Sequence, residues 1–443
     1  MRATTAAEAM ASKHRQWAHF AIQPPAKPVT APDRVCIVGA GLAGGRAALT
    51  LRQRGFEGEI AMVGEEAHPP YERPPLSKGY LSGATPTAKL WLKPPEGWRE
   101  LGVEWRPSTR VAALDRTKRR VTLAGGEQLA YTRLVLTTGS APSRLPVPGG
   151  ELPGVMTLGS LEDAERLRLR LADHPRVVVV GGGFLGCELA AAATSAGCES
   201  SLVELGTELL PGLAPEAGGV AQQAQEAHGC RVRLGATVTR IEGRSEVRSV
   251  HLEDGSRIDC ELVLVCIGSR PRVELAATSG LTVGTGVVVD RRCRTSDPSI
   301  YAAGDIASFW HPRLRRRIRL EHWDNAQRQG AHLAEAILGS GLGYHPTPYF
   351  WSEQYDRMIQ QVGCAGPRHQ RVLLGRPDSG SFSVLYLSGA RVTACLAVNR
   401  YPDLAAARRL IESGVAVDRS ALLDPETDLR TLARAALASA RPT

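Results

Sequence analysis

The sequence predicts an α/β protein with two parallel sheets and a smaller α+β domain at its C-terminal end. A buried strand, a glycine-rich turn and an apolar-faced helix follow one another at residues 35–51, and the same order recurs at 176–196. A further strand follows each helix, which is the strand–helix–strand arrangement of a parallel sheet. The C-terminal part contains strand-like runs such as 383–387 and ends in an Ala-rich helical stretch.

Length and composition exclude several classes of protein. The 443 residues correspond to about three domains of roughly 150 residues each. No apolar run approaches the roughly 18 residues that span a bilayer, so we do not expect the protein to enter membranes. The scattered cysteines, odd in number, are typical of a reducing cytoplasm, which is where we expect the protein to be. The nine cysteines include no CxxC pair. This pattern argues against a disulfide scaffold, an iron–sulfur cluster or another metal site.

Residues 1–33 differ from the rest of the chain. They carry several basic side chains and then a proline-rich stretch, but no apolar segment of a secretory signal. We expect a loosely docked or disordered arm. A targeting peptide and a partner-binding helix are the alternatives.

The first glycine-rich turn has the spacing of a dinucleotide site. Gly39 permits the tight turn, Gly41 lets a pyrophosphate approach the backbone, and Gly44 lets the helix lie close to the sheet. An acid after the next strand then binds the adenosine ribose, and Glu65 is the candidate. The alternative is that Glu65 and Glu66 form a solvated turn.

The second glycine-rich turn repeats this pattern with Gly181, Gly183 and Gly186. Glu204 is its ribose-binding candidate. A carboxylate at this place repels the 2′-phosphate of NADPH, and residues 205–207 contain no arginine to neutralise that phosphate. The sequence therefore predicts a preference for NADH over NADPH.

Two dinucleotide sites in one chain indicate that one of them binds a flavin, which accepts hydride and releases single electrons. Lys78 stands out because the chain uses few lysines and because prolines stiffen the loop before it. The alternative is an ordinary surface lysine. Glu188 lies on an apolar helix and needs a partner there. We expect an ion pair between Lys78 and Glu188.

Several segments resemble one family. The segments are 39–44, 70–78, 137–139, 181–188, 295–306, 321–326 and 349–356. Together they resemble the FAD-dependent NADH:ferredoxin reductases of bacterial oxygenase systems, a group that includes putidaredoxin, biphenyl dioxygenase and rubredoxin reductases. The resemblance implies two Rossmann-like dinucleotide-binding domains. An NAD domain at 145–269 splits the FAD domain into 34–144 and 270–344, and a C-terminal domain at 345–443 covers the flavin.

The resemblance also implies roles for individual residues. Lys78 would approach flavin N5, and Glu188 would contact the nicotinamide. Asp305 would bind the ribityl–pyrophosphate region of FAD. Trp323 would lie beside the isoalloxazine, and Trp351 would belong to the domain that covers it.

Other cofactor-binding candidates follow from the same segments. Ala43 and Val111 would line the adenosine side of the FAD site. Arg144 would replace the arginine that the family commonly has one position earlier. The remaining candidates are Leu42, Glu66, Arg73, Thr138, Gly139, Gly304, Glu321, His322 and Ala326 for FAD, and Phe184, Leu185 and Gly268 for NAD.

The reaction implied by the resemblance is electron transfer from NADH through FAD to a ferredoxin-type iron–sulfur protein that supplies an oxygenase. The chain lacks the CxxxxC pair of disulfide reductases, so electrons would leave the flavin directly. The alternatives are an NADH oxidase, a rubredoxin- or nitrite-linked reductase, and an NADH-sensing flavoprotein that acts by binding. The resemblance leaves a monomer and a homodimer open.

A basic run lies between two of the flavin-site segments. It holds five arginines in seven positions: Arg313, Arg315, Arg316, Arg317 and Arg319. One interpretation is an electropositive docking rim for an acidic [2Fe-2S] ferredoxin. The alternative is a solvated loop or an inter-subunit strip of salt bridges. Nucleic-acid binding is not expected, because no recognised motif accompanies the run.

Overall fold

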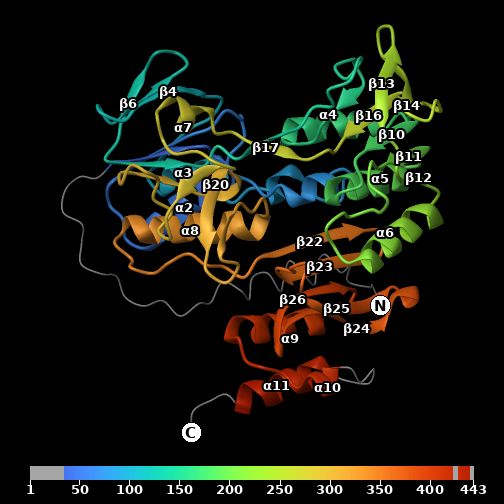
Figure 1. Ribbon diagram of the computed structural model, residues 1–443. Coiled ribbons are helices and arrows are strands. Elements are labelled where there is room, and N and C mark those ends of the chain that lie inside the picture. Colours follow the sequence, from blue (N-terminus) through green and yellow to red (C-terminus); the bar gives the residue numbers. More distant parts are fainter. Residues whose placement is uncertain (1–33, 423–427, 440–443) are drawn as a thin grey trace, which may run out of the picture.

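The computed structural model describes residues 34–422 and 428–439. The predicted arm at residues 1–33 lies outside these ranges. In Figure 1 the chain forms a blue, teal and yellow part, a green part, and a red part at the C-terminal end. Within the described ranges, no helix is long and apolar enough to cross a membrane.

The first sheet is entirely parallel and has the strand order β19-β7-β1-β2-β3. Its central strand is buried along almost its whole length, as expected for a parallel strand covered on both faces. The edge strand β19 comes late in the sequence, because the chain forms a second parallel sheet before it returns to the first. The strands are β1 (Arg34–Val38), β2 (Glu59–Val63), β3 (Val103–Arg106), β7 (Arg133–Leu136) and β19 (Ile300–Ala302).

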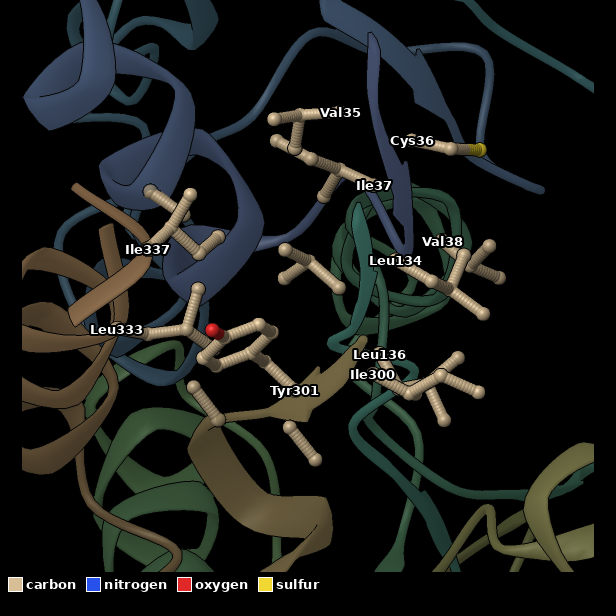
Figure 2. Close-up of a cluster of buried hydrophobic side chains, with 14 of the residues drawn as sticks. Val35, Cys36, Ile37, Val38, Leu134, Leu136, Ile300, Tyr301, Leu333 and Ile337 are labelled. Carbon is tan, nitrogen blue, oxygen red and sulfur yellow. The ribbon is translucent and has the colours of Figure 1, made fainter. Parts of the chain in front are cut away.

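Two long helices, α2 (Leu42–Gln53) and α8 (Trp323–Ile337), pack against each other beside this sheet (Figure 1). A Cβ on Gly330 of α8 would overlap the Ala43 carbonyl oxygen of α2, so glycine permits their close approach. Figure 2 shows part of the core between the strands and α8, including Leu333 and Tyr301. A short helix, α3 (Pro95–Glu100), precedes β3.

The second sheet is also parallel and has the order β12-β11-β10-β16-β9. Both predicted strand–glycine turn–helix–strand units are therefore present, one in each sheet. The strands are β9 (Val155–Met156), β10 (Val177–Val180), β11 (Ser200–Val203), β12 (Arg231–Arg233) and β16 (Leu262–Val265). The helices of this part are α4 (Leu161–Leu171), α5 (Phe184–Ser195) and α6 (Pro215–Ala227).

Two chain crossings connect the parallel sheets. The outgoing strand β8 (Ser140–Pro142) pairs antiparallel with the returning strand β17 (Ser269–Pro271). Three small sheets decorate the parallel ones. They comprise β4 (Val111–Asp115), β5 (Arg120–Leu123) and β6 (Gln128–Ala130); β13 (Val238–Gly243), β14 (Val247–Leu252) and β15 (Arg257–Asp259); and β18 (Val287–Val289), β20 (Ala307–His311) and β21 (Arg316–Ile318). A short helix, α7 (Glu274–Thr278), follows the second crossing.

The C-terminal part is an antiparallel sheet of order β22-β23-β26-β25-β24 covered by helices. Its edge strand β22 lies against α5 and α8, so it reaches both other parts (Figure 1). The predicted α/β class with a C-terminal α+β domain is confirmed. The elements are β22 (Tyr349–Gln354), β23 (Arg357–Gly363), β24 (Gln370–Arg376), β25 (Ser381–Ser388), β26 (Arg391–Val398), α9 (Tyr401–Ser413), α10 (Arg419–Leu422) and α11 (Leu429–Ser439).

Candidate functional site

The first glycine-rich turn joins β1 to α2. Gly39 has φ +111°, which favours glycine, and a Cβ on Gly44 would overlap the Gly39 carbonyl oxygen. A Cβ on Gly41 would meet nothing within 4 Å, so space is open beside the backbone at the start of α2. Unpaired N–H groups at a helix N-terminus attract phosphate. The turn therefore fits the pyrophosphate of a dinucleotide.

The two acids after β2 have different partners. Glu65 is about half exposed, at 51%, and Arg272 Nη1 donates to its Oε2 at 2.8 Å. Glu66 accepts from Tyr71 Oη and from Arg73 Nη2, each at 2.5 Å. The fold thus brings Glu66 and Arg73 together, whereas Glu65 remains at the carboxyl end of the strand, where a ribose-binding acid is needed.

Asp305 lies in a short 3-10 turn after β19 and is partly buried. The turn begins at Gly304, whose φ of +79° favours glycine. Ser140 Oγ donates to Asp305 Oδ2 at 2.9 Å. The pKa of Asp305 is raised, mainly by burial and also by the nearby charge of Glu321; the Ser140 bond and the positive charges of Arg73 and Arg319 offset part of this rise. Arg73 therefore lies near enough for its charge to act on Asp305.

Two further candidates lie beside this region, directly after β7. Thr138 Oγ1 donates to the Arg272 carbonyl oxygen at 2.8 Å, and Gly139 has φ +67°. The preceding Thr137 donates from Oγ1 to the Gly39 carbonyl oxygen at 2.8 Å. The end of β7 is thus tied both to the glycine turn and to the returning chain.

An aromatic group gathers where the three parts of the molecule meet. Phe350 of β22 lies between Phe184 of α5 and His322 at the start of α8, with ring centroids 4.7 Å and 5.0 Å away. Trp323 and Trp351 meet edge to face at 5.6 Å. Burial lowers the pKa of His322, which favours the neutral form of its imidazole.

Smaller contacts complete the predicted flavin side. Leu42, Ala43 and Ala326 form a small apolar cluster between α2 and α8, and Trp323 packs against it. Glu321 accepts from Ser269 Oγ at 2.6 Å, which links the start of α8 to β17.

The second glycine-rich turn joins β10 to α5 and matches the first in geometry. Gly181 has φ +106°, and a Cβ on Gly186 would overlap the Gly181 carbonyl oxygen. A Cβ on Gly183 would meet nothing within 4 Å. Gly268, after β16, also has positive φ, at +98°. This turn therefore fits a second pyrophosphate, and half-buried Leu185 and Phe184 follow it on α5.

Glu204 follows β11 and is held by the backbone. Its Oε2 accepts from Gly182 N at 2.5 Å and its Oε1 from Gly206 N at 2.7 Å. Carboxylate oxygens have further lone pairs that accept ribose hydroxyls. The carboxylate thus has a fixed position at the carboxyl end of the strand.

Lys78 and Glu188 form the ion pair expected from the sequence. Lys78 Nζ lies 2.5 Å from Glu188 Oε2, and the two side chains are only 18% and 7% exposed. Lys78 follows a proline-led 3-10 turn, Pro74–Ser77, and its ammonium also donates to the Pro74 carbonyl oxygen at 3.3 Å. The pair joins a loop of the first part to helix α5 of the second.

Two other candidates lie away from these contacts. Arg144 Nη1 pairs with Glu151 at 2.8 Å, and both side chains are more than three-quarters exposed. Val111 begins β4 and is partly buried at the edge of the first core. Their roles toward FAD stay predictions.

Sequence reasoning missed several polar and aromatic partners of the candidates. Three of them lie inside the segments that carry the resemblance, namely Ser77, Phe350 and Ser352. Nothing in these segments indicates that they contact residues such as Glu188 and Phe184. Ser140 and Arg272 carry no motif, because their roles depend on the pairing of β8 with β17. The missed residues are Ser77, Ser140, Arg272, Phe350 and Ser352.

Two family models match the chain. Residues 33–330 match the pyridine nucleotide-disulphide oxidoreductase model, and residues 349–433 match the reductase C-terminal model.

Named relatives align over nearly their whole length. The chain is 38% identical to the 5,5′-dehydrodivanillate O-demethylase ferredoxin reductase subunit of a Sphingobium species, over 90% of this chain and 98% of that protein. It is 36% identical to the ferredoxin–NAD(+) reductase component of the Paraburkholderia xenovorans biphenyl dioxygenase system, over 91% and 99%. In the covalent putidaredoxin reductase–putidaredoxin complex, a matching chain is 35% identical with a TM-score of 0.89, over 92% and 100%.

Proposed function

Because the chain belongs to the pyridine nucleotide-disulphide oxidoreductase family, among the ferredoxin reductases of oxygenase systems, we propose that it carries electrons from NADH to a ferredoxin-type iron–sulfur protein. The enzyme binds FAD and NAD(H). Bound FAD accepts two electrons from NADH as hydride and releases them singly. One NADH and two oxidised ferredoxins thus yield NAD+, a proton and two reduced ferredoxins.

One observation supports this proposal above the others. The Lys78–Glu188 pair joins the part with the first glycine turn to the helix that begins at the second. Two cofactors, one bound at each glycine turn, would thus meet near this pair. In our proposal Lys78 presents its ammonium to the flavin edge, and the neighbouring carboxylate of Glu188 holds the ammonium in place and faces the nicotinamide.

The remaining candidates divide by task. We propose that Asp305 and Arg73 hold the middle of FAD, with Glu65 at its ribose, and that Glu204 holds the NADH ribose. Trp323 and Trp351 exclude water from the flavin.

Rapid-mixing kinetics tests the proposed electron transfer, with putidaredoxin as the probe acceptor. We expect fast flavin reduction by NADH, slow reaction of the reduced flavin with oxygen, and transfer of single electrons to the acceptor.

The alternatives predict other results in the same experiment. An NADH oxidase would consume oxygen as fast as NADH reduces its flavin. An NADH-sensing protein would be reduced slowly and would pass no electrons to the acceptor. Either result would contradict the proposed function.

The preference for NADH gives a separate prediction. We expect kcat/KM for NADH to exceed that for NADPH by at least about tenfold, because the fixed Glu204 carboxylate repels a 2′-phosphate. Glu204→Gln keeps a side chain of the same shape without the charge, and this variant should narrow the preference. Steady-state kinetics with both cofactors measures it. A wild-type enzyme that favours NADPH would refute the role of Glu204.

Three of the five arginines of the expected docking rim make hydrogen bonds within the protein. Arg313 donates to the carbonyl oxygens of Ile411 and Glu412, at 3.1 and 3.0 Å. Arg317 donates to those of Val289 and Ser308. Arg319 donates to the Asp305 carbonyl oxygen and pairs with Glu321. These three arginines therefore hold the hairpin β20–β21 in place.

Arg315 and Arg316 at the hairpin end are exposed, and within the described residues neither has an ion pair or side-chain hydrogen bond. Trp310, which is 52% exposed, lies on the same hairpin. We propose that these three side chains dock an acidic [2Fe-2S] ferredoxin, with the charges steering its approach.

Reversing both charges tests this surface. Arg315→Glu with Arg316→Glu should lower kcat/KM for the acceptor by about tenfold at low salt and leave flavin reduction by NADH unchanged. Arg244→Glu with Arg248→Glu is the matched control, because these exposed arginines lie on the β13–β14 hairpin of another part. Equal losses in both double variants would show that only net charge matters.

A further inference from the structure

The Glu188 carboxylate, on helix α5 of the second part, accepts hydrogen bonds from both other parts of the molecule. Lys78 Nζ and Ser77 Oγ both donate to its Oε2 at 2.5 Å, from the loop of the first part. Ser352 Oγ donates to its Oε1 at 2.8 Å, from strand β22 of the C-terminal sheet. Glu188 is 6% exposed and Ser352 is fully buried. Each carboxylate oxygen therefore has its own donors.

The Ser352 bond holds the second carboxylate oxygen of Glu188, which the bonds from Lys78 and Ser77 do not reach. The terminal torsion of a glutamate is broad, and two donors on one oxygen do not fix the other oxygen. A buried carboxylate oxygen without a donor also costs free energy. Gln354 Nε2 donates to Ser352 Oγ at 3.3 Å, which leaves the serine hydroxyl hydrogen for Glu188. Ser352 thus sets the orientation of the carboxylate plane.

The backbone that carries Ser352 is itself held in place. Side chains two apart on a strand point to the same face, so Phe350 and Ser352 share one face of β22. Phe350 packs between the rings of Phe184 and His322, 4.7 and 5.0 Å away. The serine is therefore fixed against α5 by an aromatic contact two residues earlier.

We propose that Ser352 is a positioning residue for electron transfer: it orients Glu188, and through Glu188 it fixes where the Lys78 ammonium lies. Its role rests on the proposed function, since Lys78 matters for catalysis only if a flavin is reduced beside it. The C-terminal domain would then contribute directly to the geometry of the first, NADH-dependent step, as well as covering the flavin.

The same domain contains a matched control. Ser383 of β25 is also fully buried, and its Oγ donates at 2.9 Å to the carboxylate of Asp403, which is 4% exposed. This serine–carboxylate bond lies within the C-terminal domain, between its sheet and α9. Ser383→Ala therefore removes the same kind of bond without touching Glu188.

The kinetic test uses the full-length, FAD-loaded protein and the rate of flavin reduction at saturating NADH. Losing a hydrogen bond to a charged group should slow Ser352→Ala by about tenfold with an unchanged KM for NADH, and Ser383→Ala by less than about twofold. In a Glu188→Gln background, Ser352→Ala should add no further slowing. Equal rates for the two serine variants, or full additivity with Glu188→Gln, would overturn the role of Ser352.

A second readout does not depend on activity. Thermal unfolding of the same FAD-loaded variants should show that the losses in Tm from Ser352→Ala and Glu188→Gln are less than additive, because the two residues share one bond. Losses from Ser383→Ala and Glu188→Gln should add. A wild-type flavin that NADH does not reduce would refute the proposed function. A normally reduced wild type with additive Ser352 losses would refute only the positioning role.

Discussion

Replacing Lys78 by methionine should slow the reduction of bound flavin by NADH by at least about 100-fold, the scale seen when a preorganised charge is removed from an active site. Methionine keeps much of the side-chain volume and removes the one cation that, among the residues the structure describes, bonds to Glu188. Rapid-mixing absorbance of the flavin measures the rate. Lys89→Met is the control, because Lys89 is exposed on a neighbouring turn. Unchanged flavin reduction in Lys78→Met would refute the catalytic role.

The same substitution should also destabilise the protein. Breaking a buried pair leaves an uncompensated charge, which costs about 3–5 kcal/mol. Lys78→Met combined with Glu188→Gln removes both charges. The Tm of this double variant should therefore lie close to that of the wild type and above that of Lys78→Met alone. The double variant should remain slow in flavin reduction. If the double variant recovered both its Tm and its rate of flavin reduction, Lys78 would serve stability alone.

The second large effect is expected at Gly186. A Cβ there would overlap the Gly181 carbonyl oxygen, so Gly186→Ala must push helix α5 away from its glycine turn. Such overpacking costs about 3 kcal/mol. We expect a marked fall in Tm and a loss of NADH binding, measured by calorimetry and by titration with NAD+.

Gly183→Ala separates packing from cofactor binding. Gly183 has φ −73°, and a Cβ at this position meets nothing within 4 Å among the described residues. Its Tm should therefore stay close to that of the wild type. The added methyl group would occupy the space expected for the pyrophosphate, so affinity for NAD+ should still fall. Equal losses of stability in the two alanine variants would contradict this assignment of the glycines.

The fold was predictable to a large extent because its signals are local. The strand, glycine turn and helix at 35–51 and at 176–196 each read as one continuous stretch of sequence, and both units are present in the structure. The positive φ of Gly39 and Gly181 follows from the same motif. The Lys78–Glu188 contact was also expected, since a buried acid on an apolar helix needs a partner.

The partners of these residues were not predictable, because they come from distant segments. Arg272 reaches Glu65, and Ser140 reaches Asp305, only because β8 pairs with β17 where the chain leaves and re-enters the first part. The basic run shows the same limit. Its sequence presents five similar arginines. The Arg313 side chain donates to backbone carbonyl oxygens, whereas the exposed Arg315 side chain has no hydrogen bond to any described residue.

The sequence alone determined that this chain has two dinucleotide turns, an acid after each, and a lysine on a stiff loop. These features depend on residue type and spacing within short segments, which local backbone geometry dictates. Only the tertiary structure decided which side chains meet at Glu188, because that carboxylate, on the second part, accepts from donors on the first part and on the C-terminal part. Burial then makes those contacts matter, since a charge removed from water must find its hydrogen bonds within the protein.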